Sequence, residues 1–329
     1  MKRFVISVVL FFAIPLLLLA GLYAFTDPYR TMREFNRDDF DETNREYFST
    51  ELFLQNNPEQ QYNAFVFCSS RGSGINSYLW KHLLGDTIRP FVFQSWAEDL
   101  VGMEEKVNFV IQQGNHIDYA LILVDMSCTF DNRKHNSPVD QRHYLLDGGN
   151  KLTYNYRFWL NFIQKPSQWV SAIKKSRRPL SNSYDHIAND RDNDNCYLWQ
   201  ELPPQDSLSG CSAISKQTFL NQVKFQKESD IKVGSPVIDA DDVARLRRIK
   251  ATLDSHHANV KILLSPYYVY QNPMANPKDV QLLKSIFGDE NVFDYTQKSE
   301  LTTDYNYYLD PKHFGRRAGG MILQEMYKQ

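Results

Sequence analysis

The stretch Phe65-Val66-Phe67-Cys68-Ser69-Ser70-Arg71-Gly72 passes directly from apolar residues to small and polar ones. An apolar run bounded by turn residues is typical of a buried strand, and residues 68–74 have the composition of the turn that follows such a strand. A helical pattern begins at Ile75. Ligands bind outside the carboxyl ends of strands in open α/β sheets, so we expect the two serines of this turn to lie at a functional site.

A candidate partner for these serines lies near the C-terminus, in Asp310-Pro311-Lys312-His313. An Asp three residues before a His, at the start of a last helix, can place both side chains on one side of a turn. The carboxylate then orients the imidazole, and the imidazole takes a proton from a serine hydroxyl. Asp-Pro by itself is typical of an ordinary turn before a helix. Its combination with the serine turn favours a Ser-His-Asp site.

The two motifs together resemble the SGNH/GDSL hydrolase superfamily, in which a serine turn follows the first strand and an Asp-x-x-His lies near the end of the domain. They are similar in particular to a membrane-anchored branch whose first block reads Gly-Ser-Ser-Arg, with relatives in alginate O-acetylation and in D-alanyl transfer to lipoteichoic acid. By this resemblance Ser70 is the nucleophile, His313 the base and Asp310 its orienter. The resemblance implies a flavodoxin-like, three-layer α/β fold with a parallel sheet from about Ala64 to the C-terminus.

The chain departs from the family pattern at positions that bind the oxyanion. Cys68 occupies the place of a glycine in the first block. The middle blocks of the family supply a glycine and an asparagine, whereas this chain has Gln94-Ser95-Trp96-Ala97 and Asp125-Met126-Ser127 after two apolar runs. Backbone N–H groups near Ser95 and Ser127 would have to bind the oxyanion instead. Loss of one oxyanion donor typically lowers the rate by about a hundredfold or more, which argues against efficient hydrolysis more than against the fold.

The N-terminus carries Lys2 and Arg3 and then runs from Phe4 to Phe25 without a charge. A helix that crosses a bilayer needs about 20 apolar residues, and this run supplies them. A cleaved signal peptide is the alternative, but it usually has a shorter apolar core and a small-residue cleavage site. We therefore expect residues 1–25 to form an uncleaved anchor. Positive charges favour the cytoplasmic side, which places the rest of the chain in the periplasm or at the cell surface.

Residues 26–63 are polar and charged and are typical of a linker. Tyr47, Phe48, Leu52 and Phe53 have the spacing of one helical face, so we expect a short helix that docks on the domain. A solvated stalk is the alternative interpretation.

Residues 64–329 are numerous enough for one large α/β domain. Short apolar runs alternate with helical patterns, as a parallel sheet requires, and nearly continuous apolar runs indicate strands buried on both faces. The expected strands are 65–67, 91–93, 119–124, 260–264 and 292–293. The expected helices are one that begins at 75, then 98–113, 239–253, 279–287, and a last helix from 315 onward.

The alternation stops between about 129 and 238, where we expect an insertion without strands. Its aromatic residues are Tyr154, Tyr156, Phe158, Trp159, Phe162 and Trp169. Such a run is more often found in helix packing, but exposed rings can also stack on sugar rings, and the insertion would then cap the site. Residues 181–212 are rich in Asn, Asp, Ser and Pro, so we expect a loop there.

The cysteine positions and the net charge bear on disulfides, metal sites and nucleic-acid binding. Cys196 and Cys211 flank a polar segment, and in an oxidising compartment they predict a disulfide worth about 3 kcal/mol. Cys68 and Cys128 follow neighbouring expected strands and are predicted to be buried thiols. No Cys and His spacing indicates a metal site, and we expect no cofactor. The formal net charge is −2 and no basic stripe is present, which argues against a nucleic-acid partner.

These patterns favour a membrane-anchored acyl-ester enzyme. The resemblance implies O-acetyl transfer to a cell-surface or secreted polysaccharide, or its removal, beside a membrane-bound acyl-exporting O-acyltransferase. The alternative is a catalytically silent homologue that binds a glycan or a membrane partner during assembly, which the missing glycine and asparagine favour. A lipase-like hydrolase, which needs an apolar acyl groove, is the third hypothesis. Arg71 would hold either the turn or a substrate anion, and we favour the structural role.

Overall fold

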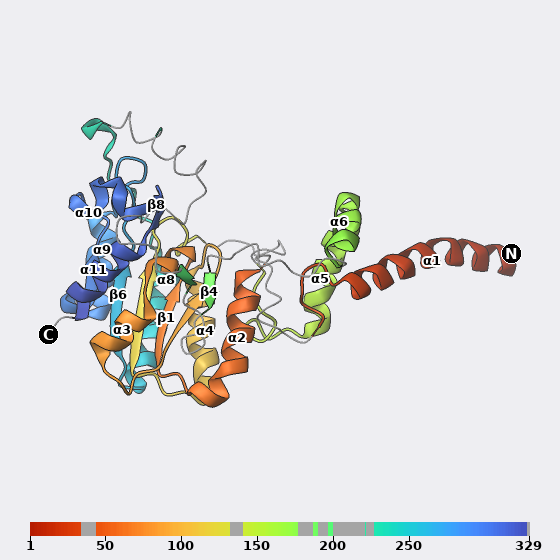
Figure 1. Cartoon of the computed structure of the whole chain (residues 1–329), viewed down its shortest axis with the longest axis horizontal. Helices are drawn as coiled ribbons and strands as arrows, with labels where there is room; N and C mark the ends of the chain where they lie inside the picture. Colours follow the sequence, from red (N-terminus) through yellow and green to blue (C-terminus); the bar gives the residue numbers. More distant parts are fainter. Residues whose placement is uncertain are drawn as a thin grey trace. The chain divides into compact units, whose positions relative to one another are not determined.

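The computed structural model describes residues 1–33, 44–131, 141–176, 187–189, 197–199, 221 and 227–327 (Figure 1). The chain forms two compact units, which are considered separately. The smaller unit comprises Met1–Phe48 and His135–Tyr184, and the larger unit comprises Ser49–Lys134 and Asp185–Gln329. All the candidate site residues lie in the larger unit.

The smaller unit contains three described helices, α1 (Lys2–Thr26), α5 (Lys151–Ile163) and α6 (Pro166–Ser176). Helix α1 has 25 residues and is long and apolar enough to cross a membrane. Most of its apolar side chains between Phe4 and Leu18 are exposed. Length and composition therefore agree with an N-terminal anchor.

Aromatic side chains hold the smaller unit together. The ring centroids of Tyr23, in the last turn of α1, and Phe162 are 5.5 Å apart, and those of Tyr29 and Phe158 are 5.0 Å apart. Tyr154, Phe158 and Phe162 are all buried on α5. For these three residues the helix-packing interpretation of the aromatic run is confirmed.

The larger unit is built on a five-stranded parallel sheet. In chain order its strands are β1 (Ala64–Cys68), β2 (Pro90–Gln94), β3 (Tyr119–Val124), β6 (Asn259–Leu264) and β7 (Val292–Asp294). Across the sheet the order is β2-β1-β3-β6-β7, and each neighbouring pair is parallel. Every residue of β1 and β2 is buried, as in a sheet covered on both faces. The expected α/β class with a parallel sheet is confirmed.

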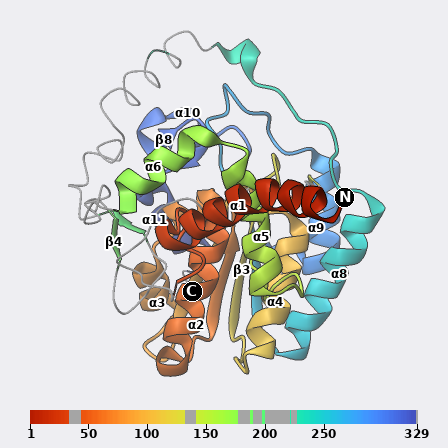
Figure 2. The ribbon, with the colours of Figure 1, turned by 90° about the vertical axis from the view of Figure 1, so that its right-hand side faces the viewer.

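Helices cover both faces of this sheet (Figures 1 and 2). One face carries α3 (Ser77–Leu84) and α11 (Arg316–Tyr327), and the other carries α2 (Arg45–Gln60), α4 (Leu100–Gln112), α8 (Ala240–Ser255) and α9 (Pro277–Phe287). Phe53 of α2 packs against Phe65 and Phe93 of the sheet and Phe109 of α4. The expected helix before the first strand is therefore present and docks on the sheet.

The remaining described elements are short. They are the 3₁₀ helices η2 (Ser70–Gly74), η3 (Glu228–Asp230), η4 (Asp289–Asn291) and η5 (Tyr305–Tyr307), the helix α10 (Glu300–Thr303), and the strands β8 (Tyr308–Asp310) and β9 (His313–Phe314). Strands β8 and β9 pair antiparallel. Among these elements, η2 and the β8–β9 hairpin carry the candidate site.

Polar caps explain where the larger helices begin. Asn76 and Asp99 accept hydrogen bonds from backbone N–H groups in the first turns of α3 and α4. Both helices consequently begin two residues later than the apolar pattern predicts. Asp239 caps α8 in the same way.

The expectation of no strand between about 129 and 238 is wrong. Strands β4 (Ile187–Asn189) and β5 (Tyr197–Trp199) form an antiparallel pair within the segment expected to be a loop. Strands of three residues are too short to produce the alternation by which a strand is recognised. Cys196 and Cys211 lie outside the described residues. Cys68 and Cys128 are buried free thiols, as predicted.

Glycines allow the turn after β1 to touch the C-terminal segment. A Cβ atom on Gly74 would overlap the ring of Phe314, and a Cβ atom on Gly319 would overlap the carbonyl oxygen of Gly74. The backbone of η2 and that of α11 are therefore in direct contact. This contact places the turn that carries Ser70 against the residue that follows His313.

We expect Gly319→Ala to destabilise the protein by at least about 1–3 kcal/mol, because the new methyl group would push α11 away from η2. Gly320→Ala is the matched control, since its Cβ would meet its nearest neighbour, a Leu79 side-chain carbon, at 3.5 Å. Alanine has the higher helix propensity, so this control should be neutral or stabilising by up to about 1 kcal/mol. Denaturant unfolding of the full chain in detergent micelles measures both changes. Equal stability of the two variants would contradict the proposed contact.

Candidate active site

Ser70, His313 and Asp310 form one hydrogen-bonded series. The Oγ atom of Ser70 lies 2.9 Å from Nε2 of His313, and Nδ1 of the same imidazole lies 2.7 Å from Oδ2 of Asp310. Ser70 begins η2 at the carboxyl end of β1, whereas Asp310 ends β8 and His313 begins β9. The structure thus brings together residues that lie 243 positions apart in the sequence.

The Asp310 carboxylate organises the hairpin that holds His313. Its Oδ1 atom accepts hydrogen bonds from the backbone N–H of Lys312 at 2.8 Å and of His313 at 3.1 Å. Partial burial by itself would raise the pKa of Asp310, but the hydrogen bonds and the charge of His313, together with the Lys312 N–H, lower the pKa below its ordinary value. An ionised carboxylate only accepts hydrogen bonds, so the imidazole proton sits on Nδ1. Nε2 is then left to accept the proton of the Ser70 hydroxyl.

The series remains open to solvent. The side chain of His313 is 29% exposed and that of Asp310 is 48% exposed. Ser70 is half-buried, whereas the neighbouring Ser69 is fully buried. Of the two serines, Ser70 is therefore the one that a substrate can reach.

A buried ion pair fastens the turn that carries Ser70. The side chains of Arg71 and Asp125 are 2% and 6% exposed, and Nε of Arg71 lies 2.9 Å from Oδ2 of Asp125. The guanidinium carbon lies 3.7 Å from the ring centroid of Tyr267, whose hydroxyl donates to Oδ1 of Asp125 at 2.8 Å. Ser69 donates to the same carboxylate at 3.3 Å. The geometry thus gives Arg71 the structural role that we favoured from the sequence.

The Asp125 carboxylate is ionised in this network. Burial would raise the pKa of Asp125, but the Arg71 charge and the hydrogen bonds donated by Ser127 and Tyr267 lower it below the ordinary value. Burial and the neighbouring Asp125 charge raise the pKa of Tyr267, so its hydroxyl keeps its proton and donates it. The carboxylate therefore accepts from Ser69, Ser127 and Tyr267 and pairs with Nε of Arg71, whereas Nη1 of Arg71 is buried without a hydrogen-bond partner among the described residues.

Ser95 and Ser127 do not direct their N–H groups to an open position. The N–H of Ser95 donates to the carbonyl of Cys68 at 3.2 Å. The N–H of Ser127 donates to Oδ1 of Asp125 at 2.9 Å and to the hydroxyl of Tyr267 at 3.1 Å. A substrate oxyanion would have to displace these partners, so the geometry does not support the assignment of these two residues to an oxyanion hole.

The Ser95 hydroxyl belongs instead to a buried charged cluster. It donates to the carboxylate of Glu98, and the Lys106 ammonium group pairs with the same carboxylate and lies 3.3 Å from Oγ of Ser95. All three side chains are buried. The cluster joins the end of β2 to α4 and is structural.

The structure adds three residues to the site that we did not assign to it from the sequence. The Nε2 atom of Gln94 donates to the Ser70 carbonyl at 2.9 Å, and Asp125 and Tyr267 hold Arg71. Gln94 ends β2 and Asp125 follows β3, the two strands that flank β1. The sequence offered a signal for Gln94 and Asp125. Both are polar residues at strand ends, and neighbouring parallel strands end at the same edge of a sheet, so both could have been placed near Ser70. Tyr267 had no such signal, since its contact depends on the loop after β6.

Cys68 ends β1, and the turn that follows accommodates its side chain. A Cβ atom on Gly72 would overlap Sγ of Cys68, so the glycine at position 72 provides the room that the thiol needs. The thiol donates weakly to the carbonyl of Phe93 at 3.5 Å. Gly72, four positions after Cys68, thus allows the turn to accommodate the thiol.

Within the described ranges, no group of three or more His, Cys, Asp or Glu side chains could hold a metal ion. Comparison of the chain with protein-family models, with curated proteins and with solved structures found no match. A functional proposal therefore rests on the residues of this chain.

We expect Asp125→Asn to lower the free energy of unfolding by about 3–5 kcal/mol near neutral pH, because Arg71 would be left buried without its counter-ion. The folded-state pKa of Asp125 is depressed, so its stabilisation is complete above the unfolded-state pKa of about 3.9 and is lost as the pH falls toward the folded-state pKa. The difference between wild type and variant should therefore shrink below about pH 4. Denaturant unfolding across this pH range measures it.

Asp254→Asn is the matched control, because Asp254 is 53% exposed and pairs with Lys250 at the protein surface. Its loss should cost less than about 1 kcal/mol. A similar loss in the two variants would contradict a structural role for the buried pair.

Proposed function

We propose that this protein is a membrane-anchored acyl-ester enzyme that acts on O-acyl groups of an extracytoplasmic polysaccharide. Ser70 is the nucleophile, His313 the base and Asp310 its orienter. The observation that carries the proposal is the unbroken series from the Ser70 hydroxyl through both imidazole nitrogens to the Asp310 carboxylate. Such a series turns a weakly nucleophilic hydroxyl into an attacking group.

The reaction divides into two proton-balanced steps. In the first, Oγ of Ser70 bonds to the acyl carbonyl carbon, its proton passes to Nε2 of His313, and the ester bond to the leaving alcohol breaks as that alcohol takes the proton. In the second, the oxygen of water or of a sugar hydroxyl bonds to the acyl carbon and its proton passes to Nε2; the bond between that carbon and Oγ of Ser70 then breaks as Oγ takes the proton from Nε2. Asp310 stabilises the imidazolium formed in each step.

The backbone N–H of Ser70 is the donor best placed to bind the oxyanion. Ser70 is the first residue of η2, where a helix offers no acceptor for the N–H group. Gln94 holds the carbonyl of the same residue and so fixes the orientation of this peptide. A site with few oxyanion donors slows hydrolysis and transfer alike, because both routes form an oxyanion on the acyl carbon.

The sheet supports membership of the SGNH/GDSL superfamily. Numbered along the chain, its strands lie in the order 2-1-3-4-5, which is that of flavodoxin-like sheets. Such sheets bind ligands at the carboxyl edge where the strand order reverses, between the strands here named β1 and β3. Ser70 follows β1 at this edge, and Asp125 follows β3.

Helix α1 and its flanking charges support the proposed location. The helix is long and apolar enough to span a bilayer, and Lys2 and Arg3 precede its apolar run. Positive charges favour the cytoplasmic side, which supports a position of the catalytic unit outside the membrane. A membrane-bound protein that exports acyl groups would then supply the acyl donor at the same surface.

A second candidate is a catalytically silent protein that binds a glycan or a membrane partner. The observation that favours it is that the N–H groups of Ser95 and Ser127 are engaged within the protein. This candidate predicts that substitution of Ser70 leaves binding and cellular function intact.

Full-length protein in detergent micelles should hydrolyse p-nitrophenyl acetate and react with a fluorophosphonate probe. We expect Ser70→Ala and His313→Ala to lower turnover by at least about a thousandfold, because each removes a reacting group. Asp310→Asn should have a smaller effect, since the imidazole remains. Turnover and in-gel labelling measure these losses.

Ser73→Ala is the matched control, because Ser73 lies in the same turn as Ser70 and has no hydrogen bond to His313. It should keep both turnover and labelling. Labelling that survives in Ser70→Ala, or a wild type that neither turns over nor labels, would refute the catalytic assignment and favour the binding protein.

A further inference from the structure

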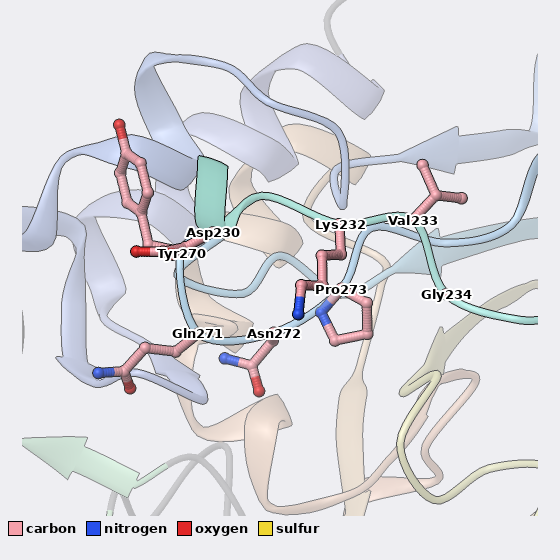
Figure 3. A pocket seen from close by; sticks show the side chains of 8 residues that line it. All are labelled: Asp230, Lys232, Val233, Gly234, Tyr270, Gln271, Asn272 and Pro273. Carbon is pink, nitrogen blue, oxygen red and sulfur yellow. The ribbon is translucent and has the colours of Figure 1, made fainter. Parts of the chain in front are cut away.

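A hollow of about 500 Å³ lies at the end of the loop that follows β6 (Figure 3). This volume is within the range of about 300–1,000 Å³ that is typical of small-molecule sites. The residues that line it are Asp230, Lys232, Val233, Gly234, Tyr270, Gln271, Asn272 and Pro273. They come from two segments that lie far apart in the sequence.

Hydrogen bonds join the two segments into one wall. The N–H of Gly234 donates to the carbonyl of Met274 at 2.8 Å, and the N–H of Met274 donates to the carbonyl of Lys232 at 2.8 Å. The Asn276 amide also donates to the Gly234 carbonyl at 2.8 Å. In Figure 3 the Lys232 side chain runs from its own segment toward the loop that carries Asn272. The hollow is therefore preformed.

The same wall is attached to the candidate active site. Nδ2 of Asn272, which lines the hollow, donates to the carbonyl of Pro311 at 2.9 Å. The N–H of Tyr268 donates to the same carbonyl at 3.1 Å. Pro311 lies between Asp310 and His313, so the turn that holds the base rests on the loop that forms the hollow. The loop that forms the hollow is thereby linked to the turn that carries His313.

The lining groups define the chemistry of the ligand. Lys232 and Gln271 have side chains without a hydrogen-bond partner among the residues that the structure describes. Lys232 only donates, the Asp230 carboxylate only accepts, and the Gln271 amide does both. Tyr270 adds a partly exposed ring. Hydroxyl groups both donate and accept, and a ring face can stack on an aromatic side chain, so a polyhydroxylated ring can contact all these groups. A lipid chain would contact Val233, Pro273 and the Tyr270 ring but would leave the polar groups without a partner.

We infer that this hollow binds a pyranose unit of the glycan that accepts or carries the acyl group. The sugar ring lies on Tyr270, and its hydroxyl groups bind Lys232, Gln271 and Asp230. The neighbouring unit of the glycan then reaches the Ser70 hydroxyl. This inference rests on the proposed acyl-ester function, to which it adds an acceptor subsite.

The test uses the full-length chain in detergent micelles and immobilised tetrasaccharides of glucose, N-acetylglucosamine, galactose and mannuronic acid. Wild type and Ser70→Ala should bind at least one of them. Tyr270→Ala and Lys232→Ala should each weaken that binding about tenfold or more, because each removes one contact to the sugar. Tyr78→Ala is the matched control, since Tyr78 is an exposed tyrosine of α3 that does not line the hollow. Thermal unfolding checks that every variant is folded.

The outcomes separate this inference from the proposed function. Binding that depends on Tyr270 and Lys232 supports the subsite, and it does so even if the wild type has no esterase activity, in which case only the catalytic assignment fails. If wild type and Tyr78→Ala hydrolyse p-nitrophenyl acetate but no tetrasaccharide binds, the subsite is refuted while the catalytic assignment stands. Equal binding by Tyr270→Ala, Lys232→Ala and wild type refutes the subsite in every case.

Discussion

Direct backbone contact between the turn after β1 and the C-terminal helix is the constraint on which the site depends. Gly74 and Gly319 have no room for a Cβ atom, so η2 and α11 approach as closely as two main chains can. Phe314 packs against the same turn, and His313 precedes it. The Ser70 hydroxyl and the imidazole meet because this contact joins two segments that are distant in the sequence. A bulkier residue at either glycine would separate the Ser70 hydroxyl from the imidazole.

The polar groups at this edge of the sheet form two pairs, one buried and one partly exposed. Arg71 and Asp125 are buried and hold the turn from behind, and a buried ion pair of this kind contributes to specificity of structure more than to net stability. His313 and Asp310 are partly exposed and face the solvent. The buried pair therefore fixes the turn that carries Ser70, and the partly exposed pair remains accessible to solvent. This division holds the series in place while leaving it accessible to a large substrate.

The loop after β6 contacts the buried ion pair, the turn that holds His313 and the hollow. Tyr267 lies against Arg71, Tyr268 binds the turn between Asp310 and His313, and Tyr270 lines the hollow beyond. One short loop thus contacts the support of the nucleophile, the turn of the base and the proposed sugar subsite. An acceptor that binds this loop would be positioned relative to all the reacting groups at once.

The sequence by itself was sufficient for the apolar N-terminal helix, the five parallel strands and the pairing of Ser70 with Asp310 and His313. The helix and the strands follow from local signals, which are an uncharged apolar run and continuous hydrophobic segments. The two polar motifs are local signals as well, but the choice of Ser70 over Ser69 came from the resemblance to the SGNH/GDSL superfamily. Only the tertiary structure decided that the N–H groups of Ser95 and Ser127 are engaged and that a hollow adjoins the His313 turn. These features depend on which loops meet at the edge of the sheet, and no local pattern records such contacts, because the groups in contact are distant along the chain.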